Sequence, residues 1–203
     1  MKENLKLGGI LLTITVIAGL LLGFANSLTA EAILENSKVS KEDLKDILPT
    51  ASSIADTQGV EVNETINEVY DALDESGKKV GNVFKVTTKG FHGPVELVLA
   101  ISNEEKVTGM KVLTHSETPG LGAKITEDEF LSRVKNIPIL QDIEIIKVEP
   151  SMDHHIQGVS GASVSSKAVG TAINDAIRFY KENIKGEEVA PKEEVDSTTS
   201  ATQ

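Results

Sequence analysis

A long, mostly hydrophobic run lies near the amino terminus. No charged residue occurs from Leu7 to Ala30. About 20 apolar residues are enough to cross the hydrocarbon core of a bilayer as a helix. Residues 1–30 are therefore expected to form a membrane anchor. A cleaved signal peptide is the alternative, because residues 25–27 are small, but the run is longer than the roughly 7–15 apolar residues usual in such peptides.

The charges that flank this run predict its orientation. Lys2 and Lys6 precede it, and Glu31 and Glu35 follow it. Positively charged residues tend to stay on the cytoplasmic side of a membrane. The amino terminus is therefore expected in the cytoplasm and the rest of the chain on the extracytoplasmic side.

Several later segments show the hydrophobic period of a helix. The expected helices are 31–48, 61–75, 126–136 and 165–184. Pro49 ends the first, whose polar composition predicts a stalk. The second places Ile66, Val69, Tyr70 and Leu73 on one face. In the third, Thr126 is expected to cap a first turn that is rich in acidic residues.

The segments between these predicted helices include several with the alternating pattern of strands. The expected strands are 81–91, 95–102, 107–115 and 143–148. In the second of them, Val95, Leu97, Leu99 and Ile101 share one face, as expected for a half-buried strand. A polar turn at 103–106 joins it to the third as a hairpin. The whole pattern predicts an α+β fold with an antiparallel sheet and flanking helices.

These segments predict four regions along the chain. We expect an anchor at 1–30, a stalk or linker helix at 31–60, one folded domain at 61–185 and a disordered acidic tail at 186–203. The tail is rich in Glu, Ser and Thr and has no apolar period, which is typical of disorder. A chain of 203 residues fits one ordinary domain with such appendages.

Composition excludes several kinds of chemistry. The chain has no cysteine, which excludes disulfides, thiolate nucleophiles, cysteine-ligated iron–sulfur clusters and covalent c-type haem. Its net charge of −11 disfavours nucleic acid, which requires clustered Lys and Arg. Redox chemistry in this chain would therefore need an organic cofactor.

Small and hydroxyl residues gather before the last predicted helix, in the sequence HIQGVSGASVSSKAVG at 155–170. Two hydrolase motifs are absent from this stretch. The nucleophile elbow, G-x-S-x-G, needs Gly where Ala162 stands, and the S-x-x-K motif needs Ser where Val164 stands, three residues before Lys167. Two interpretations remain. One serine caps the helix, or several hydroxyls and the free N–H groups of the helix start bind a phosphate.

The adjacent residues Asp153, His154 and His155 are metal-binding types. Neighbouring residues on a strand point to opposite faces. The two histidines are therefore not expected to share one ion.

Three separated motifs resemble the FMN-binding domain family. Residues 160–163, SGAS, resemble its S/T-G-A-T flavinylation motif. Residues 90–97, GFHGPVEL, are similar to its G-Y-x-G-P-I-E-L, and residues 115–122, HSETPGLG, match its H-x-E-T-P-G-L-G. The motifs occur in the family's order, and the similarity extends over about residues 5–184. That order makes the resemblance much more specific than SGAS alone.

The resemblance implies a covalently bound FMN. In the family, the last hydroxyl residue of the flavinylation motif carries FMN through a phosphoester bond, and this residue is Ser163 here, where Thr is usual. It implies that Ser160, Gly161, Ala162, Ser165 and Ser166 surround the phosphate. It further implies that the loop with Glu117, Thr118, Gly120, Leu121 and Gly122 forms a wall for the isoalloxazine ring. No catalytic residue and no metal ligand follow from it.

The resemblance also implies a place in a membrane complex. The domain occurs in the G subunit of the Rnf complex, which couples electron transfer between ferredoxin and NAD⁺ to Na⁺ or H⁺ transport, and in the C subunit of the Na⁺-translocating NADH:quinone reductase. The single anchor and the length favour the former. The implied partners are the other subunits, the membrane and a flavin transferase. A flavin-free binding or assembly subunit is the remaining alternative.

Overall fold

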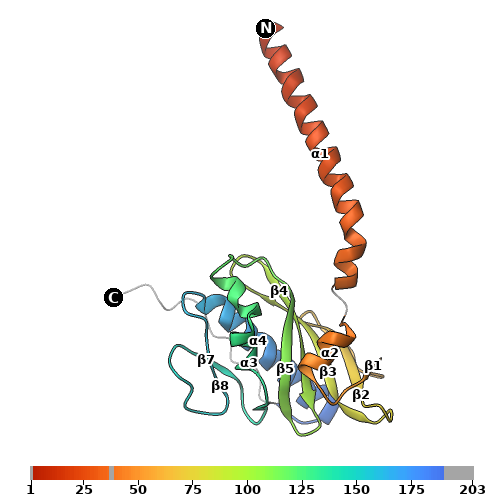
Figure 1. Ribbon diagram of the computed structural model, residues 1–203, viewed down its shortest axis with the longest axis vertical. Coiled ribbons are helices and arrows are strands. Elements are labelled where there is room, and N and C mark those ends of the chain that lie inside the picture. Colours follow the sequence, from red (N-terminus) through yellow and green to blue (C-terminus); the bar gives the residue numbers. More distant parts are fainter. Residues whose placement is uncertain (1, 37–38, 190–203) are drawn as a thin grey trace. The chain divides into compact units, whose positions relative to one another are not determined.

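The computed structural model describes residues 2–36 and 39–189, which belong to two compact units divided after Ser40 (Figure 1). The first unit is the helix α1, Lys2–Asn36. Its stretch Lys6–Thr29 has a mean hydropathy of 2.3, and none of its most apolar part is buried. The structure therefore contains the apolar helix that the sequence predicts as an anchor.

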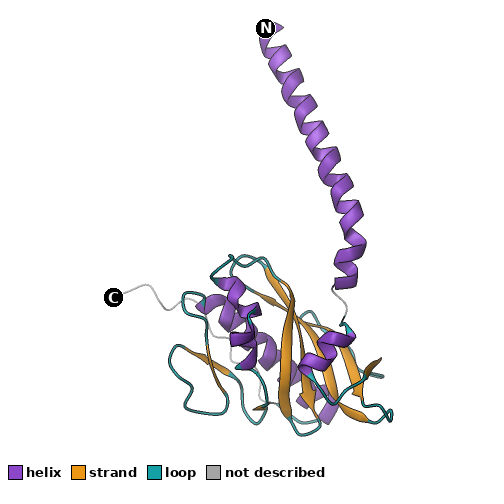
Figure 2. Ribbon diagram, viewed as in Figure 1, coloured by secondary structure: helices purple, strands orange, loops and turns teal. Residues whose placement is uncertain are grey.

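The second unit is built on an antiparallel sheet of six strands in which neighbours in sequence are neighbours in space (Figure 2). The strands are β1 (Ser53–Asp56), β2 (Ile66–Leu73), β3 (Lys79–Lys89), β4 (Pro94–Ser102), β5 (Lys106–Thr114) and β6 (Ile137–Pro138). A second, parallel pair is formed by β7 (Glu144–Ile146) and β8 (His155–Gln157). The predicted α+β fold is confirmed.

One face of the large sheet packs against the long helix α4, Ser163–Phe179. Phe84 of β3 lies edge-on to both Phe179 and Tyr180, with ring centroids 6.2 and 6.4 Å away. Ile173 and Ile177 of α4 join the same buried cluster. The helix continues as a π-helical segment, Tyr180–Lys185, so the last predicted helix begins and ends close to its expected limits. Burial of this apolar stripe stabilises the unit.

The opposite face of the sheet is also covered. Val98 and Ala100 alternate with the core residues of β4 and are fully buried. The short helix α2, Lys41–Ile47, packs against β5. Thr108 of β5 donates a hydrogen bond of 2.5 Å to the Ile47 carbonyl, and the Gly109 backbone approaches Ile47 closely. Helix α2 is thus part of the folded unit.

Replacing Ile47 with alanine is expected to destabilise this unit by about 2–5 kcal/mol, because Ile47 is fully buried and a cavity would remain. Denaturant unfolding of the full chain, followed by circular dichroism, measures the change. The exposed Lys45 of the same helix provides the control: Lys45→Ala is expected to change stability by less than about 0.5 kcal/mol. Equal stability of the two variants would show that α2 does not contribute to the fold.

Three predictions about local structure are corrected. The polar helix expected over 31–48 is divided, because α1 ends at Asn36 and α2 begins at Lys41. The helix expected over 61–75 is wrong, since this segment contains strand β2. The helix expected over 126–136 is limited to α3, Asp128–Ser132. Thr126 does not cap it, because its hydroxyl donates to the Ala123 carbonyl within a preceding 3₁₀ turn, Gly122–Thr126.

The physical reason for the error at β2 is a break in its alternation. A register shift between Ile66 and Glu68 inserts one extra residue against β3. Bulges of this kind change which face the following side chains occupy. Ile66 and Val69 consequently both join the core cluster although they are three residues apart, and a spacing of three resembles a helical period.

The ends of the predicted regions are only partly described. The folded unit begins at Lys41, earlier than residue 61, where the sequence places the start of the domain. Most of the expected acidic tail, residues 190–203, lies outside the described residues. The functional division of the chain into anchor, stalk, domain and tail stays a prediction.

Candidate functional site

The carboxylate of Glu117 joins the three sequence motifs. Its Oε1 accepts hydrogen bonds from the backbone N–H groups of Phe91 and His92, at 2.7 and 3.2 Å. Its Oε2 accepts the hydroxyl proton of Ser165, at 2.6 Å. Glu117 is 5% exposed, so these bonds replace water around a buried charge. The motifs at 90–97 and 115–122 and the segment directly after the SGAS motif therefore meet at one side chain.

Hydrogen bonding keeps Glu117 ionised. Burial favours the neutral acid, but the bonds from Ser165, His92 and Phe91 stabilise the anion and together hold the pKa of Glu117 below its ordinary value. The sequence placed Glu117 in the wall of a flavin pocket. The structure shows that both of its carboxylate oxygens are already hydrogen-bonded within the chain.

Two glycines are required by the close packing around this carboxylate. A Cβ atom at Gly90 would lie 2.3 Å from Glu117 Oε1, and one at Gly122 would lie 2.5 Å from Oε2. Both distances are far inside van der Waals contact, so neither position accepts a side chain without displacing Glu117. The glycines of the two loop motifs thus allow the loops to approach the carboxylate.

The four serines near the start of α4 separate into two kinds. Ser165 and Ser166 are buried. The Ser166 hydroxyl donates to the Ala162 carbonyl at 3.0 Å and accepts the Val159 N–H at 2.9 Å. Ser160 and Ser163 are exposed. Ser165 and Ser166 therefore hold the loop in place, whereas Ser160 and Ser163 face solvent.

Helix α4 begins at Ser163 without a side-chain cap. Its N-cap residue is Ala162, and no side-chain hydrogen bond caps this end in the described chain. The interpretation of a serine as the helix cap is therefore wrong. The first N–H groups of a helix lack partners within the helix and carry the positive end of its dipole. An exposed hydroxyl at this position lies where a phosphate is stabilised.

A hollow of about 330 Å³ lies beside Ser163. Its lining includes Ser160, Gly161, Ser163, Lys147 and Lys167. The sequence motifs did not identify the two lysines as site residues. For Lys167, the sequence did contain a signal: it follows Ser163 by four residues, which puts both on one face of the helix. Lys147 follows the end of β7, and only the fold brings it here.

Most of the remaining predicted site residues lie on the loop at 115–122, next to the SGAS motif. Gly120 has φ = +76°, a conformation that favours glycine. Leu121 is half exposed, and its Cδ2 would lie 3.5 Å from a Cβ at Gly161. Thr118 is exposed, and its hydroxyl lies 3.3 Å from His92 Nδ1. The structure therefore brings the loop and the SGAS motif together, with Leu121 and Thr118 open to solvent.

An exposed apolar side chain beside the start of a helix offers a contact for an aromatic ring next to a place that favours a phosphate, and a flavin nucleotide has both groups. The family comparison agrees, because residues 90–178 match the model of the FMN-binding domain. The matched segment contains Glu117, the loop and Ser163. The fold and this segment thus define a protein of the FMN-binding-domain class.

Known relatives identify the family more closely. The chain is 34% identical over 183 residues to the G subunit of an ion-translocating oxidoreductase complex from Methanosarcina acetivorans, and the match covers 88% of this chain and 95% of the relative. It is 30% identical over 197 residues to the G subunit of the Na⁺-translocating ferredoxin:NAD⁺ oxidoreductase complex from Acetobacterium woodii, covering 89% and 93%. The chain belongs to this family of G subunits of ion-translocating oxidoreductase complexes.

A solved structure has the same fold. The crystal structure of NqrC from Shewanella oneidensis superimposes with a TM-score of 0.51 at 21% identity, over 65% of this chain and 68% of NqrC. The resemblance to the FMN-binding domain family is thereby confirmed in both sequence and fold.

Proposed function

We propose that this chain is a membrane-anchored electron carrier in an Rnf-type ferredoxin:NAD⁺ oxidoreductase that drives Na⁺ or H⁺ transport, with FMN bound covalently to Ser163. Membership of the G-subunit family supports the complex and the other subunits as partners. The helix Lys6–Thr29 supports anchoring in the membrane. The charge asymmetry around it supports a cytoplasmic amino terminus and an extracytoplasmic domain.

The single observation that carries the flavin attachment is the position of Ser163. It opens the uncapped helix α4, it is exposed, and it lines a hollow with Lys147 and Lys167. The helix dipole and the two ammonium groups favour the charge of a phosphate. The residues present therefore fit the phosphate end of FMN.

The chain's own residues hold and orient this group. A flavin transferase would form the bond from a flavin nucleotide whose phosphate is part of a phosphoanhydride: the Ser163 Oγ attacks this phosphate, the phosphoanhydride bond breaks, and the departing nucleotide phosphate takes up the hydroxyl proton. Ser160 offers a further hydroxyl. Leu121 and Thr118, on the loop held by Glu117, provide the contact surface for the ring. When bound, FMN supplies one-electron transfer chemistry, which the protein itself lacks.

Mass spectrometry tests this proposal directly. The full chain is produced in cells that contain a flavin transferase and is then denatured. We expect in-gel flavin fluorescence, an intact mass increased by that of FMN less one water, and a modified peptide in which Ser163 carries the addition. A denatured chain from the native complex without bound flavin would contradict the covalent attachment.

A further inference from the structure

The two-stranded sheet β7–β8 carries a cluster of metal-binding side chains that the flavin chemistry does not use. The pairing places Glu144 of β7 opposite His155 of β8. His154 does not belong to the strand, because β8 begins at His155 and His154 lies in the preceding turn. The alternation that would send neighbouring side chains to opposite faces therefore does not apply to this pair.

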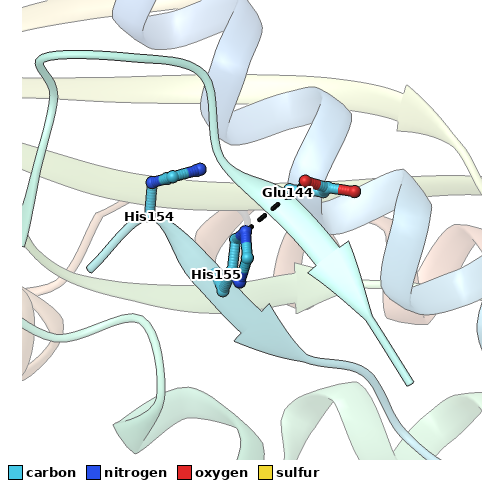
Figure 3. Close-up of side chains that lie close together, drawn as sticks. All are labelled: Glu144, His154 and His155. Carbon is cyan, nitrogen blue, oxygen red and sulfur yellow. Dashed lines mark ion pairs between the residues drawn. The ribbon is translucent and has the colours of Figure 1, made fainter. Parts of the chain in front are cut away.

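The three side chains converge at the beginning of the strand pair (Figure 3). One donor atom from each of Glu144, His154 and His155 lies within 4.8 Å of the other two. His155 Nε2 is 3.5 Å from Glu144 Oε2, and the two imidazole rings are 4.5 Å apart between centroids. Ser151 Oγ lies 3.5 Å from His155 Nδ1, which leaves Nε2 directed toward the carboxylate.

We infer that Glu144, His154 and His155 form a binding site for a divalent transition-metal ion such as Zn²⁺. Two imidazoles and one carboxylate are ligands that Zn²⁺ accepts at about 2.0–2.2 Å. Donors bound to one ion at this distance are separated by up to about 4 Å, so small rotations of these partly exposed side chains bring all three into range. Water completes the coordination.

The imidazole ligands decide the class of ion. Mg²⁺ and Ca²⁺ prefer sites made of oxygen ligands, whereas nitrogen ligands favour Zn²⁺ and its transition-metal neighbours. His155 is largely shielded, while Glu144 is mostly exposed. An ion bound here would therefore remain accessible from solvent on one side.

Such an ion would link β7 and β8 at the start of the strand pair. The other end of the pair borders the hollow beside Ser163. The register continues from Glu144–His155 to Ile146–Gln157, and both Ile146 and Gln157 line that hollow. The chain just before β7 is also held to α4, because Asn174 binds both the N–H and the carbonyl of Ile143. A bound ion would thus stabilise the strand pair that forms part of the lining of the hollow beside Ser163.

The test is a Zn²⁺ titration of the full chain in detergent, purified without a polyhistidine tag and competed against a chromogenic zinc indicator. We expect one Zn²⁺ per chain. His154→Gln and His155→Gln should each weaken binding more than about tenfold, equivalent to 1.4 kcal/mol, and Glu144→Gln should weaken it measurably. Zn²⁺ should also raise the melting temperature of the native chain and not that of the two histidine variants.

Two matched variants provide the controls. Asp153→Asn removes the neighbouring exposed carboxylate, and His92→Gln removes a histidine distant in sequence; both should bind Zn²⁺ like the native chain. No binding by the native chain, unchanged binding in both histidine variants, or an equal loss in Asp153→Asn would overturn the assignment. Circular dichroism without metal verifies folding, and His154→Gln decides the question if His155→Gln does not fold.

Discussion

Ser163→Ala is expected to give a folded chain that carries no covalent flavin. Ser163 is exposed at the first position of α4, and its side chain makes no cap hydrogen bond. Removing the hydroxyl therefore costs little stability, within about 0.5 kcal/mol, but it removes the only atom of this residue that can form the phosphoester. Fluorescence of the denatured chain and its intact mass should both show complete loss of the flavin.

Two further variants show whether Ser163→Ala loses the flavin because the attachment atom is missing or because the loop is disturbed. Ser163→Thr keeps a hydroxyl at the same position and should retain the flavin. Ser160→Ala removes the other exposed hydroxyl of the motif and should retain it as well. Flavin that persists in Ser163→Ala and disappears in Ser160→Ala would move the attachment to Ser160. Thermal unfolding of each apo-chain shows whether a loss has a structural cause.

Glu117→Ala is expected to destabilise the domain by about 3 kcal/mol or more. The substitution leaves the buried Ser165 hydroxyl without its acceptor, which costs about 1–3 kcal/mol, and it also removes the acceptor of the part-buried N–H groups of Phe91 and His92. It also opens a cavity between the two loops and the start of α4. Denaturant unfolding measures this loss, and flavin attachment should fall too, because the loop at 115–122 is no longer tied to α4.

Glu117→Gln should cost less, about 1 kcal/mol, because the amide oxygen can replace Oε1 and the Ser165 hydroxyl can turn to accept from the amide nitrogen. The exposed Glu149 provides the control, and Glu149→Ala should stay within about 0.5 kcal/mol of the native chain. Stability of Glu117→Ala equal to this control would show that the carboxylate does not organise the site.

The stabilisation by Glu117 should depend on pH in a defined direction. Its pKa in the folded chain lies below the ordinary value of 4.5, so folding favours the anion. The contribution is complete above pH 4.5 and is lost as the pH falls through the lowered pKa of the folded state. The stability difference between the native chain and Glu117→Gln should be constant near neutral pH and shrink in acid. A difference that grows in acid would contradict the shift.

Local patterns in the sequence were sufficient to predict the anchor helix, the last helix and four of the eight strands in the described part of the chain, namely β3, β4, β5 and β7. The uncharged run at the amino terminus, the alternation of Val95, Leu97, Leu99 and Ile101, and the apolar stripe of α4 are each contained within one element. Regular elements with one buried face have a period that can be recognised along the chain. Strand β2 was predicted wrongly because its bulge replaced alternation with a spacing of three.

The sequence alone also determined which family's motifs are present and that Ser163 occupies the last position of the SGAS motif, where we propose that the flavin is attached. Only the tertiary structure decided what most of the other site residues do. Glu117 meets Phe91 and Ser165, 26 and 48 residues away, and Lys147 reaches Ser163 only because β7 packs on α4. The convergence of His154 and Glu144 likewise depends on strand pairing and a turn. Long-range contacts of this kind leave no period in the sequence, since they depend on how separate elements pack and not on the spacing within any one of them.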